Sequence, residues 1–183
     1  MPPEPLSSAE ALVVDDDEAV REVIVSYLFK QGMAVTGAAD GRAAITALER
    51  SNGRYRLVVT DLSLPGADGL AVLRAARQAN ASSYVVIVTG YASLDSAISA
   101  VRLGAYDYLT KPFSLGQLDV ILRRIDDRES LERENRELLH GEPAPRGAAA
   151  PGDLTERLQR LEAAVARIEA AVGSQEYASL RRR

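Results

Sequence analysis

The stretch LVVTDLSLPGADGL, residues 57–70, decides the fold of this chain. It opens with a short apolar run of the kind that forms a buried strand, and the run stops at Thr60 and Asp61. A loop rich in proline and glycine follows before helical spacing resumes. Asp61 is therefore predicted to lie at the carboxyl end of a buried strand, where open α/β sheets keep their ligand sites. A buried carboxylate there is costly unless a cation or hydrogen-bond donors meet it.

The same alternation of strand and amphipathic helix extends in both directions from this stretch. The five strand-like runs are Ala11–Val14, Ala34–Ala38, Leu57–Thr60, Tyr84–Thr89 and Tyr106–Leu109. Helix-spaced apolar residues follow each run, and the last helix is predicted to start near Ser114. This pattern predicts an α/β fold, a doubly wound parallel sheet with helices on both faces. Right-handed crossovers then gather the carboxyl ends of all five strands at one edge.

Polar side chains stand at the ends of four of these strands, namely Asp15 and Asp16, Asp61, Thr89 and Lys111. Each of them alone has a commoner structural explanation, such as a helix N-cap or a turn. Together, three carboxylates at one edge repel one another unless a cation lies between them. Oxygen ligands of this kind suit Mg²⁺, and a lysine and a hydroxyl suit phosphoryl oxygens. The joint pattern indicates a Mg²⁺-dependent phosphoryl site.

Composition narrows the classes of function. The chain has 183 residues, a net charge of −4, no cysteine and one histidine. These values exclude disulfides, thiol chemistry and a His/Cys zinc cluster, and they argue against a nucleic-acid surface. No apolar run approaches the ~20 residues of a membrane span, and the start has no secretion signal. We therefore expect a cytoplasmic protein that contacts neither membrane nor nucleic acid directly.

Four motifs carry a resemblance to a known family. They are VVDDDEAVR at 13–21, TDLSLPGADGL at 60–70, VTG at 88–90 and GAYDYLTKPF at 104–113. With these motifs the chain resembles the receiver domain of bacterial two-component response regulators, and most of all receivers of the NtrC type. The resemblance implies the flavodoxin-like (βα)5 fold with strand order 2-1-3-4-5. It also implies a protein that is not an enzyme, because phosphoryl transfer occurs only onto and off its own Asp61.

The resemblance further implies a role for each site residue. Asp61 would accept a phosphoryl group from a sensor histidine kinase or a phosphotransfer protein. Mg²⁺ would be held by Asp15, Asp16, Asp61 and the backbone carbonyl of Ser63.

The remaining site residues would act on the phosphoryl group or respond to it. Lys111 would pair with one phosphoryl oxygen, and the Thr89 hydroxyl would move to another. Tyr108 would be the switch residue whose ring turns inward, although an ordinary strand aromatic is an equally simple interpretation. The Lys111–Pro112 peptide is predicted to be cis. We also hypothesise that a bulky Tyr91 screens the acyl phosphate from water.

The chain beyond the receiver has its own organisation. The predicted segments are a disordered lead at 1–9, the receiver at 10–125, a helical extension at 126–140, a flexible Pro/Ala/Gly linker at 141–152, an amphipathic coiled-coil helix at 153–175 and a frayed terminus at 176–183. The 4-3-4 spacing of apolar residues in the coiled-coil helix is marginal for an isolated helix and favours a partner. We expect a homodimer, or capture of a partner protein, through residues 114–140 and 153–172. No motif of an output domain is found in the sequence.

Three alternatives remain. The chain could be the regulatory fragment of an NtrC-type transcriptional activator without its ATPase and DNA-binding domains. It could be a haloacid-dehalogenase-like phosphatase, because Asp15 and Asp17 form a D-x-D at a strand end. It could also be a pseudo-receiver scaffold, which is disfavoured because all five hallmark side chains are present.

Overall fold

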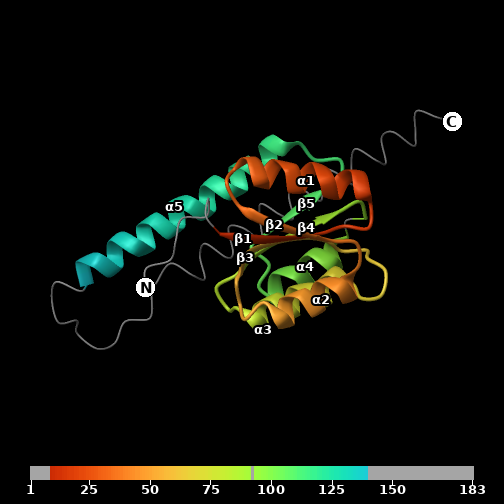
Figure 1. Cartoon of the computed structure of the whole chain (residues 1–183), viewed down its shortest axis with the longest axis horizontal. Helices are drawn as coiled ribbons and strands as arrows, with labels where there is room; N and C mark the ends of the chain where they lie inside the picture. Colours follow the sequence, from red (N-terminus) through yellow and green to blue (C-terminus); the bar gives the residue numbers. More distant parts are fainter. Residues whose placement is uncertain (1–8, 92, 140–183) are drawn as a thin grey trace.

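Five parallel strands form the centre of the molecule in the computed structural model, which describes residues 9–91 and 93–139 (Figure 1). The strands are β1 (Glu10–Val14), β2 (Ala34–Ala38), β3 (Tyr55–Asp61), β4 (Tyr84–Thr89) and β5 (Asp107–Thr110), in the sheet order 2-1-3-4-5. The helices are α1 (Glu18–Lys30), α2 (Gly41–Arg50), α3 (Gly69–Ala79), α4 (Leu94–Arg102) and α5 (Leu115–Leu139). The predicted flavodoxin-like fold is confirmed.

Helices cover both faces of the sheet. Figure 1 shows α1 and α5 on one face and α2, α3 and α4 on the other. Each face has its own apolar core, because successive strand residues point in opposite directions. Thus Val13 and Leu109 pack toward α1 and α5, whereas Leu12 and Tyr108 pack toward the other three helices. The central strands are buried on both sides, as their continuous apolar runs predict.

Gly69 allows the backbone to approach closely beside Asp61. It is the first residue of α3, and its N–H donates to the carbonyl of Leu62 at 2.9 Å. A β-carbon at Gly69 would lie 2.1 Å from the carbonyl oxygen of Asp61 and 2.8 Å from Cα of Leu62. Both of these are backbone atoms, which cannot turn away, so only glycine fits where α3 meets the end of β3.

The last helix is fastened to the domain by apolar and polar contacts. Its buried apolar residues are Leu118, Ile121, Leu122 and Ile125. One turn further on, the Glu129 carboxylate is buried and pairs with Arg56 of β3. The predicted helical extension past residue 125 is therefore present as far as Leu139 and remains in contact with the sheet at Glu129. The predicted domain boundary at 125 itself stays a prediction.

Some element boundaries differ from those predicted. Strand β3 begins at Tyr55, two residues before the predicted start at Leu57. The sequence pattern missed these residues because Arg56 interrupts the apolar run, although the Tyr55 side chain is buried. The Lys111–Pro112 bond is cis, as predicted. Residues 1–8 of the predicted lead at 1–9, the linker, the coiled-coil helix and the terminus at 176–183 lie outside the described residues. Within the described part of the chain, no helix has the length and hydropathy required to cross a bilayer.

Candidate functional site

The predicted site residues converge at the carboxyl edge of the sheet. Asp15 follows the last residue of β1, Asp61 ends β3, Thr89 ends β4 and Lys111 follows β5. Strands β1 and β3 are direct neighbours, so their terminal carboxylates come together although they are far apart in sequence. The crossovers of the parallel sheet thus create the site, as the sequence predicted.

The Lys111 ammonium bridges two of the carboxylates. Its Nζ lies 2.6 Å from Asp61 Oδ2 and 2.7 Å from Asp15 Oδ2. Burial by itself would lower the pKa of Lys111, but the hydrogen bonds and charges of the two carboxylates raise it above its ordinary value. Burial raises the pKa of the Asp15 carboxyl, and the hydrogen bond and charge of Lys111 partly oppose that rise. The lysine is therefore charged and placed directly beside the candidate acceptor.

The acidic cluster fits a divalent cation. Asp15, Asp16 and Asp61 each offer one carboxylate oxygen, and these oxygens all lie within 4.8 Å of one another. Two of the residues are buried and Asp16 is exposed, so the cluster opens to solvent on one side. An all-oxygen donor set with an open side suits Mg²⁺, which retains several of its waters. The fourth predicted ligand, the Ser63 carbonyl, stays a prediction.

Local hydrogen bonds hold the carboxylates in place. Ser63 N–H donates to Asp61 Oδ1 at 3.0 Å, and Asp17 N–H donates to Asp15 Oδ1 at 3.1 Å. Asp17 points elsewhere, because its Oδ1 accepts the N–H groups of Ala19 and Val20 and caps α1. The second aspartate of the D-x-D pair in the phosphatase interpretation thus serves as a helix cap, and the acidic cluster consists of Asp15, Asp16 and Asp61.

Thr89 is fully buried at the end of β4. Its Oγ1 accepts the N–H of Tyr91 at 3.2 Å. This bond uses an oxygen lone pair and leaves the hydroxyl proton to be donated. The Tyr91 side chain is 84% exposed, so its ring lies in solvent.

Tyr108 is buried at 3% exposure, and its hydroxyl meets a residue that the sequence interpretation missed. The Ser96 Oγ lies 3.1 Å from the Tyr108 hydroxyl oxygen. The only sequence signal for Ser96 is its spacing of three from Ser93, which is typical of a helix-capping pair. That signal predicts a cap and gives no information about a contact with β5.

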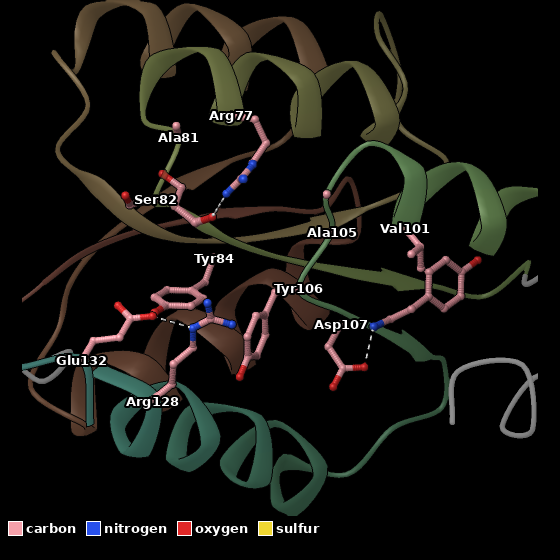
Figure 2. A pocket seen from close by; sticks show the side chains of 13 residues that line it. Arg77, Ala81, Ser82, Tyr84, Val101, Ala105, Tyr106, Asp107, Arg128 and Glu132 are labelled. Carbon is pink, nitrogen blue, oxygen red and sulfur yellow. Dashed lines mark hydrogen bonds and ion pairs between the residues drawn. The ribbon is translucent and has the colours of Figure 1, made fainter. Parts of the chain in front are cut away.

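A cavity of about 320 Å³ lies elsewhere, at the beginning of the strands (Figure 2). Its wall includes Tyr84 and Asp107, the first residues of β4 and β5. Tyr84 and Tyr106 stack edge to face there with ring centroids 5.0 Å apart. Arg77 lies on the α3 side of this cavity and Arg128 on the α5 side (Figure 2). The acidic cluster is at the opposite ends of the strands and is separate from this cavity.

A parallel sheet of order 2-1-3-4-5 with an aspartate cluster at its carboxyl edge defines a receiver domain of two-component signalling. The family model of the response regulator receiver domain matches residues 11–123. This chain belongs to that family.

Similar proteins agree with the assignment. The response regulator protein PilR of Pseudomonas aeruginosa is 33% identical over 143 residues, which are 76% of this chain and 32% of PilR. The DNA-binding transcriptional regulator NtrC of Escherichia coli is 35% identical over 112 residues, 61% of this chain and 24% of NtrC. The crystal structure of a CheY-like receiver domain protein from Methanospirillum hungatei gives a TM-score of 0.63 at 28% identity, covering 68% of this chain and 98% of that one. The predicted similarity to NtrC-type receivers is confirmed, and the chain spans less than a third of the length of these curated relatives.

Replacing Lys111 with methionine is expected to destabilise the metal-free protein. Two buried carboxylates then lose their shared cation, which costs about 3 kcal/mol of the free energy of unfolding. Binding of Mg²⁺ to the folded cluster should restore part of this loss and stabilise the variant more than the wild type. Urea unfolding with EDTA and with MgCl₂ measures both effects.

The only other lysine provides the control. Lys30 is exposed at the end of α1, so Lys30→Met should change the free energy of unfolding by less than about 0.5 kcal/mol. Equal metal-free stabilities for the two variants would contradict the bridging role of Lys111.

Proposed function

We propose that this chain is a phosphoacceptor response regulator that receives a phosphoryl group on Asp61 and signals through protein contacts. The observation that carries the proposal is that the Asp61 carboxylate lies 2.6 Å from the Lys111 ammonium and in one cluster with the carboxylates of Asp15 and Asp16. A cation and an oxygen-rich cluster beside the same carboxylate form the environment that phosphoryl transfer requires. The proposed donor is a histidine kinase or a phosphotransfer protein.

In the proposed reaction an Asp61 carboxylate oxygen forms a bond to phosphorus while the P–N bond of the donor phosphohistidine breaks. The imidazole nitrogen leaves with the bonding electron pair. Asp15, Asp16 and Asp61, with the Ser63 carbonyl, would hold Mg²⁺, which when bound would neutralise charge on the phosphoryl oxygens. The chain carries out transfer only onto and off its own Asp61, so it is not an enzyme acting on a separate substrate.

Two further residues respond to the phosphoryl group. The ammonium of Lys111 moves from its carboxylate partners to a phosphoryl oxygen. The Thr89 hydroxyl turns from Tyr91 N–H to donate its proton to another phosphoryl oxygen. Phosphorylation then favours the buried orientation of the Tyr108 ring and changes the surface formed by α4, β5 and α5.

A phosphodonor assay tests this function. The full chain is incubated with acetyl phosphate and MgCl₂, and intact-protein mass spectrometry follows the uptake of one phosphoryl group. We expect uptake that requires Mg²⁺ and stops when EDTA is added. Unmodified protein after long incubation with magnesium would refute the proposal.

The output is proposed to pass through the helical segments at 114–140 and 153–172, either as a homodimer or by capture of a partner protein. Exposed Val120 and Leu131 on α5 support a contact of this kind, because large apolar side chains are costly to leave in water. Deleting residues 153–183 should change the oligomeric state measured by light scattering, in the phosphorylated or the unphosphorylated protein.

A second candidate is the regulatory part of an NtrC-type transcriptional activator. The observation that favours it is the alignment with less than a third of PilR and NtrC. In that case the signal would be relayed to ATPase and DNA-binding domains, and deleting 153–183 would leave the oligomeric state of the receiver unchanged.

Tyr91→Ala is expected to shorten the lifetime of the phosphorylated protein. Tyr91 follows Thr89 by two residues and its ring is exposed, and we propose that this ring limits the approach of water to an acyl phosphate. Tyr91→Phe keeps the bulk and should keep the wild-type lifetime. Loss of the phosphoryl group is followed by mass spectrometry after the donor is removed, and an equal or longer lifetime in the alanine variant contradicts the screening role.

A further inference from the structure

The Tyr108 side chain is already buried in the receiver without a phosphoryl group. It lies in the core under α2, α3 and α4, in the same cluster as Ala97 and Ala100 of α4. Its hydroxyl oxygen lies 3.1 Å from the Ser96 Oγ, which is in the first turn of α4. The ring that is proposed to respond to phosphorylation is thus bonded to a helix that is proposed to move.

Ser96 also closes the amino-terminal cap of α4. The Ser96 N–H donates to Ser93 Oγ at 3.1 Å, and the Ser93 N–H donates to Ser96 Oγ at 3.2 Å. The Ser96 hydroxyl donates to the carbonyl of Ser93 at 2.9 Å. One hydroxyl therefore serves both the helix cap and the contact with β5.

Several polar atoms meet at the Ser96 hydroxyl. Its oxygen lies 2.9 Å from both the Ser93 carbonyl oxygen and the Ser93 Oγ, and 3.1 Å from the Tyr108 hydroxyl oxygen. Each hydroxyl has a single proton, and either oxygen can donate in the contact between Ser96 and Tyr108. Burial raises the pKa of Tyr108, the hydrogen bond with Ser96 opposes that rise, and the negative charge of Asp61 adds to it. The Tyr108 hydroxyl is thus joined to the side chain that closes the cap of α4.

The backbone connects the first turn of α4 to the candidate site. Tyr91 donates its N–H to the Thr89 hydroxyl, and α4 is capped only two residues later by Ser93. Across the sheet, Lys111 N–H donates to the Thr89 carbonyl at 2.8 Å and ties the end of β5 to the end of β4. A shift of the Thr89 hydroxyl toward a phosphoryl group therefore acts on the segment that leads into the Ser93–Ser96 cap.

We propose that Ser96 is a positioning residue of the switch, whose hydroxyl holds the Tyr108 ring in its buried orientation and couples that orientation to the first turn of α4. The proposal rests on the proposed phosphoacceptor function. The proposal gives the Ser96 side chain of α4 a role in coupling the candidate site to the Tyr108 ring, in addition to the roles of Thr89 and Tyr108. Without this hydroxyl, the ring and the helix turn lose their shared bond, and each can change position without the other.

Hydrogen exchange of the unphosphorylated protein tests the coupling. The Ala97 N–H donates to the Ser93 carbonyl in this turn, so its exchange reports the opening of the cap. Tyr108→Phe should speed this exchange about two- to tenfold, the effect of losing one neutral hydrogen bond. In a Ser96→Ala background, the same Tyr108→Phe change should have no further effect. An equal effect of Tyr108→Phe in both backgrounds would overturn the coupling.

Two variants serve as controls. Ser99→Ala removes a hydroxyl one turn further along α4 and should leave the effect of Tyr108→Phe unchanged. Ser96→Thr keeps a hydroxyl at this position and should restore the sensitivity of the Ala97 N–H to Tyr108→Phe. If Ser96→Thr behaves like Ser96→Ala, the hydroxyl is not the coupling group.

A second arm uses beryllofluoride, an analogue of the phosphoryl group, with MgCl₂. Ser96→Ala should weaken beryllofluoride binding about two- to tenfold, because the buried ring orientation favoured by phosphorylation is no longer held in advance. Wild-type affinity in Ser96→Ala would overturn the role of Ser96 in the switch. Failure of the wild type to bind beryllofluoride or to accept a phosphoryl group would refute the proposed function instead, while the exchange experiment would still decide whether Ser96 and Tyr108 are coupled.

Discussion

Asp61→Asn should abolish phosphoryl uptake from acetyl phosphate, with no increase in the intact mass of the protein. An asparagine amide is not a carboxylate nucleophile and forms no acyl phosphate under these conditions. The substitution keeps the size and shape of the side chain. Its oxygen can still accept the Ser63 N–H, so the fold is expected to be retained. Circular dichroism and urea unfolding check that the loss is chemical and not structural.

Asp68→Asn is the matched control for this experiment. Asp68 is an exposed aspartate seven positions later that caps α3 by accepting the Ala71 N–H at 2.7 Å. Asparagine caps helices about as well as aspartate, so this variant should accept a phosphoryl group at the wild-type rate. Uptake at the wild-type rate by Asp61→Asn would show that another residue is the acceptor.

Gly69→Ala is expected to cost about 3 kcal/mol of the free energy of unfolding, as overpacking of a tight backbone contact does. The new methyl group would lie 2.1 Å from the Asp61 carbonyl oxygen, and α3 and the end of β3 must separate to admit it. Because the displaced residue is the proposed acceptor, phosphoryl uptake should also slow. Urea unfolding measures the first effect and the acetyl phosphate assay the second.

Gly116→Ala tests whether any glycine-to-alanine change would do the same. Gly116 is exposed in the first turn of α5, and a β-carbon there would meet only the Ser114 Oγ at 3.7 Å, an ordinary contact. Alanine in a helix is favoured over glycine by up to about 1 kcal/mol, so this variant should be as stable as the wild type or more stable. A Gly69→Ala protein with wild-type stability would contradict the close approach of α3 to Asp61.

The alternation of strands and helices could be predicted because each element has its own local spacing of apolar residues. The continuous apolar runs of β1, β3 and β4 and the polar residues that end them predict a buried parallel sheet with its site at one edge. The same signatures misplaced the start of β3, since Arg56 interrupts the run that Tyr55 begins. A local pattern cannot show that this arginine is needed for a buried ion pair with Glu129, 73 residues away.

The side-chain contacts inside the candidate site could not be predicted from local sequence patterns. The sequence placed Asp15, Asp61 and Lys111 on one edge, yet the lysine that bridges both carboxylates is visible only in three dimensions. It also offered Asp17 as a partner of Asp15 in a D-x-D pair, whereas the Asp17 side chain accepts N–H groups of α1 as a helix cap. Side-chain direction depends on which donors lie nearest after folding, and periodicity carries no information about that.

The sequence by itself determined the fold family, the strand order through the family motifs, and the edge of the sheet that carries the candidate site. The edge of the sheet follows from hydrophobic periodicity and from the handedness of crossovers, which act over short segments of the chain. The fold family and the strand order come from the resemblance of the motifs. Only the tertiary structure decided that Gly69 lies against the Asp61 carbonyl and that Tyr108 bonds with Ser96. Such contacts join residues of different elements at distances of a few ångströms, and they are set by how closely the packed backbones approach one another.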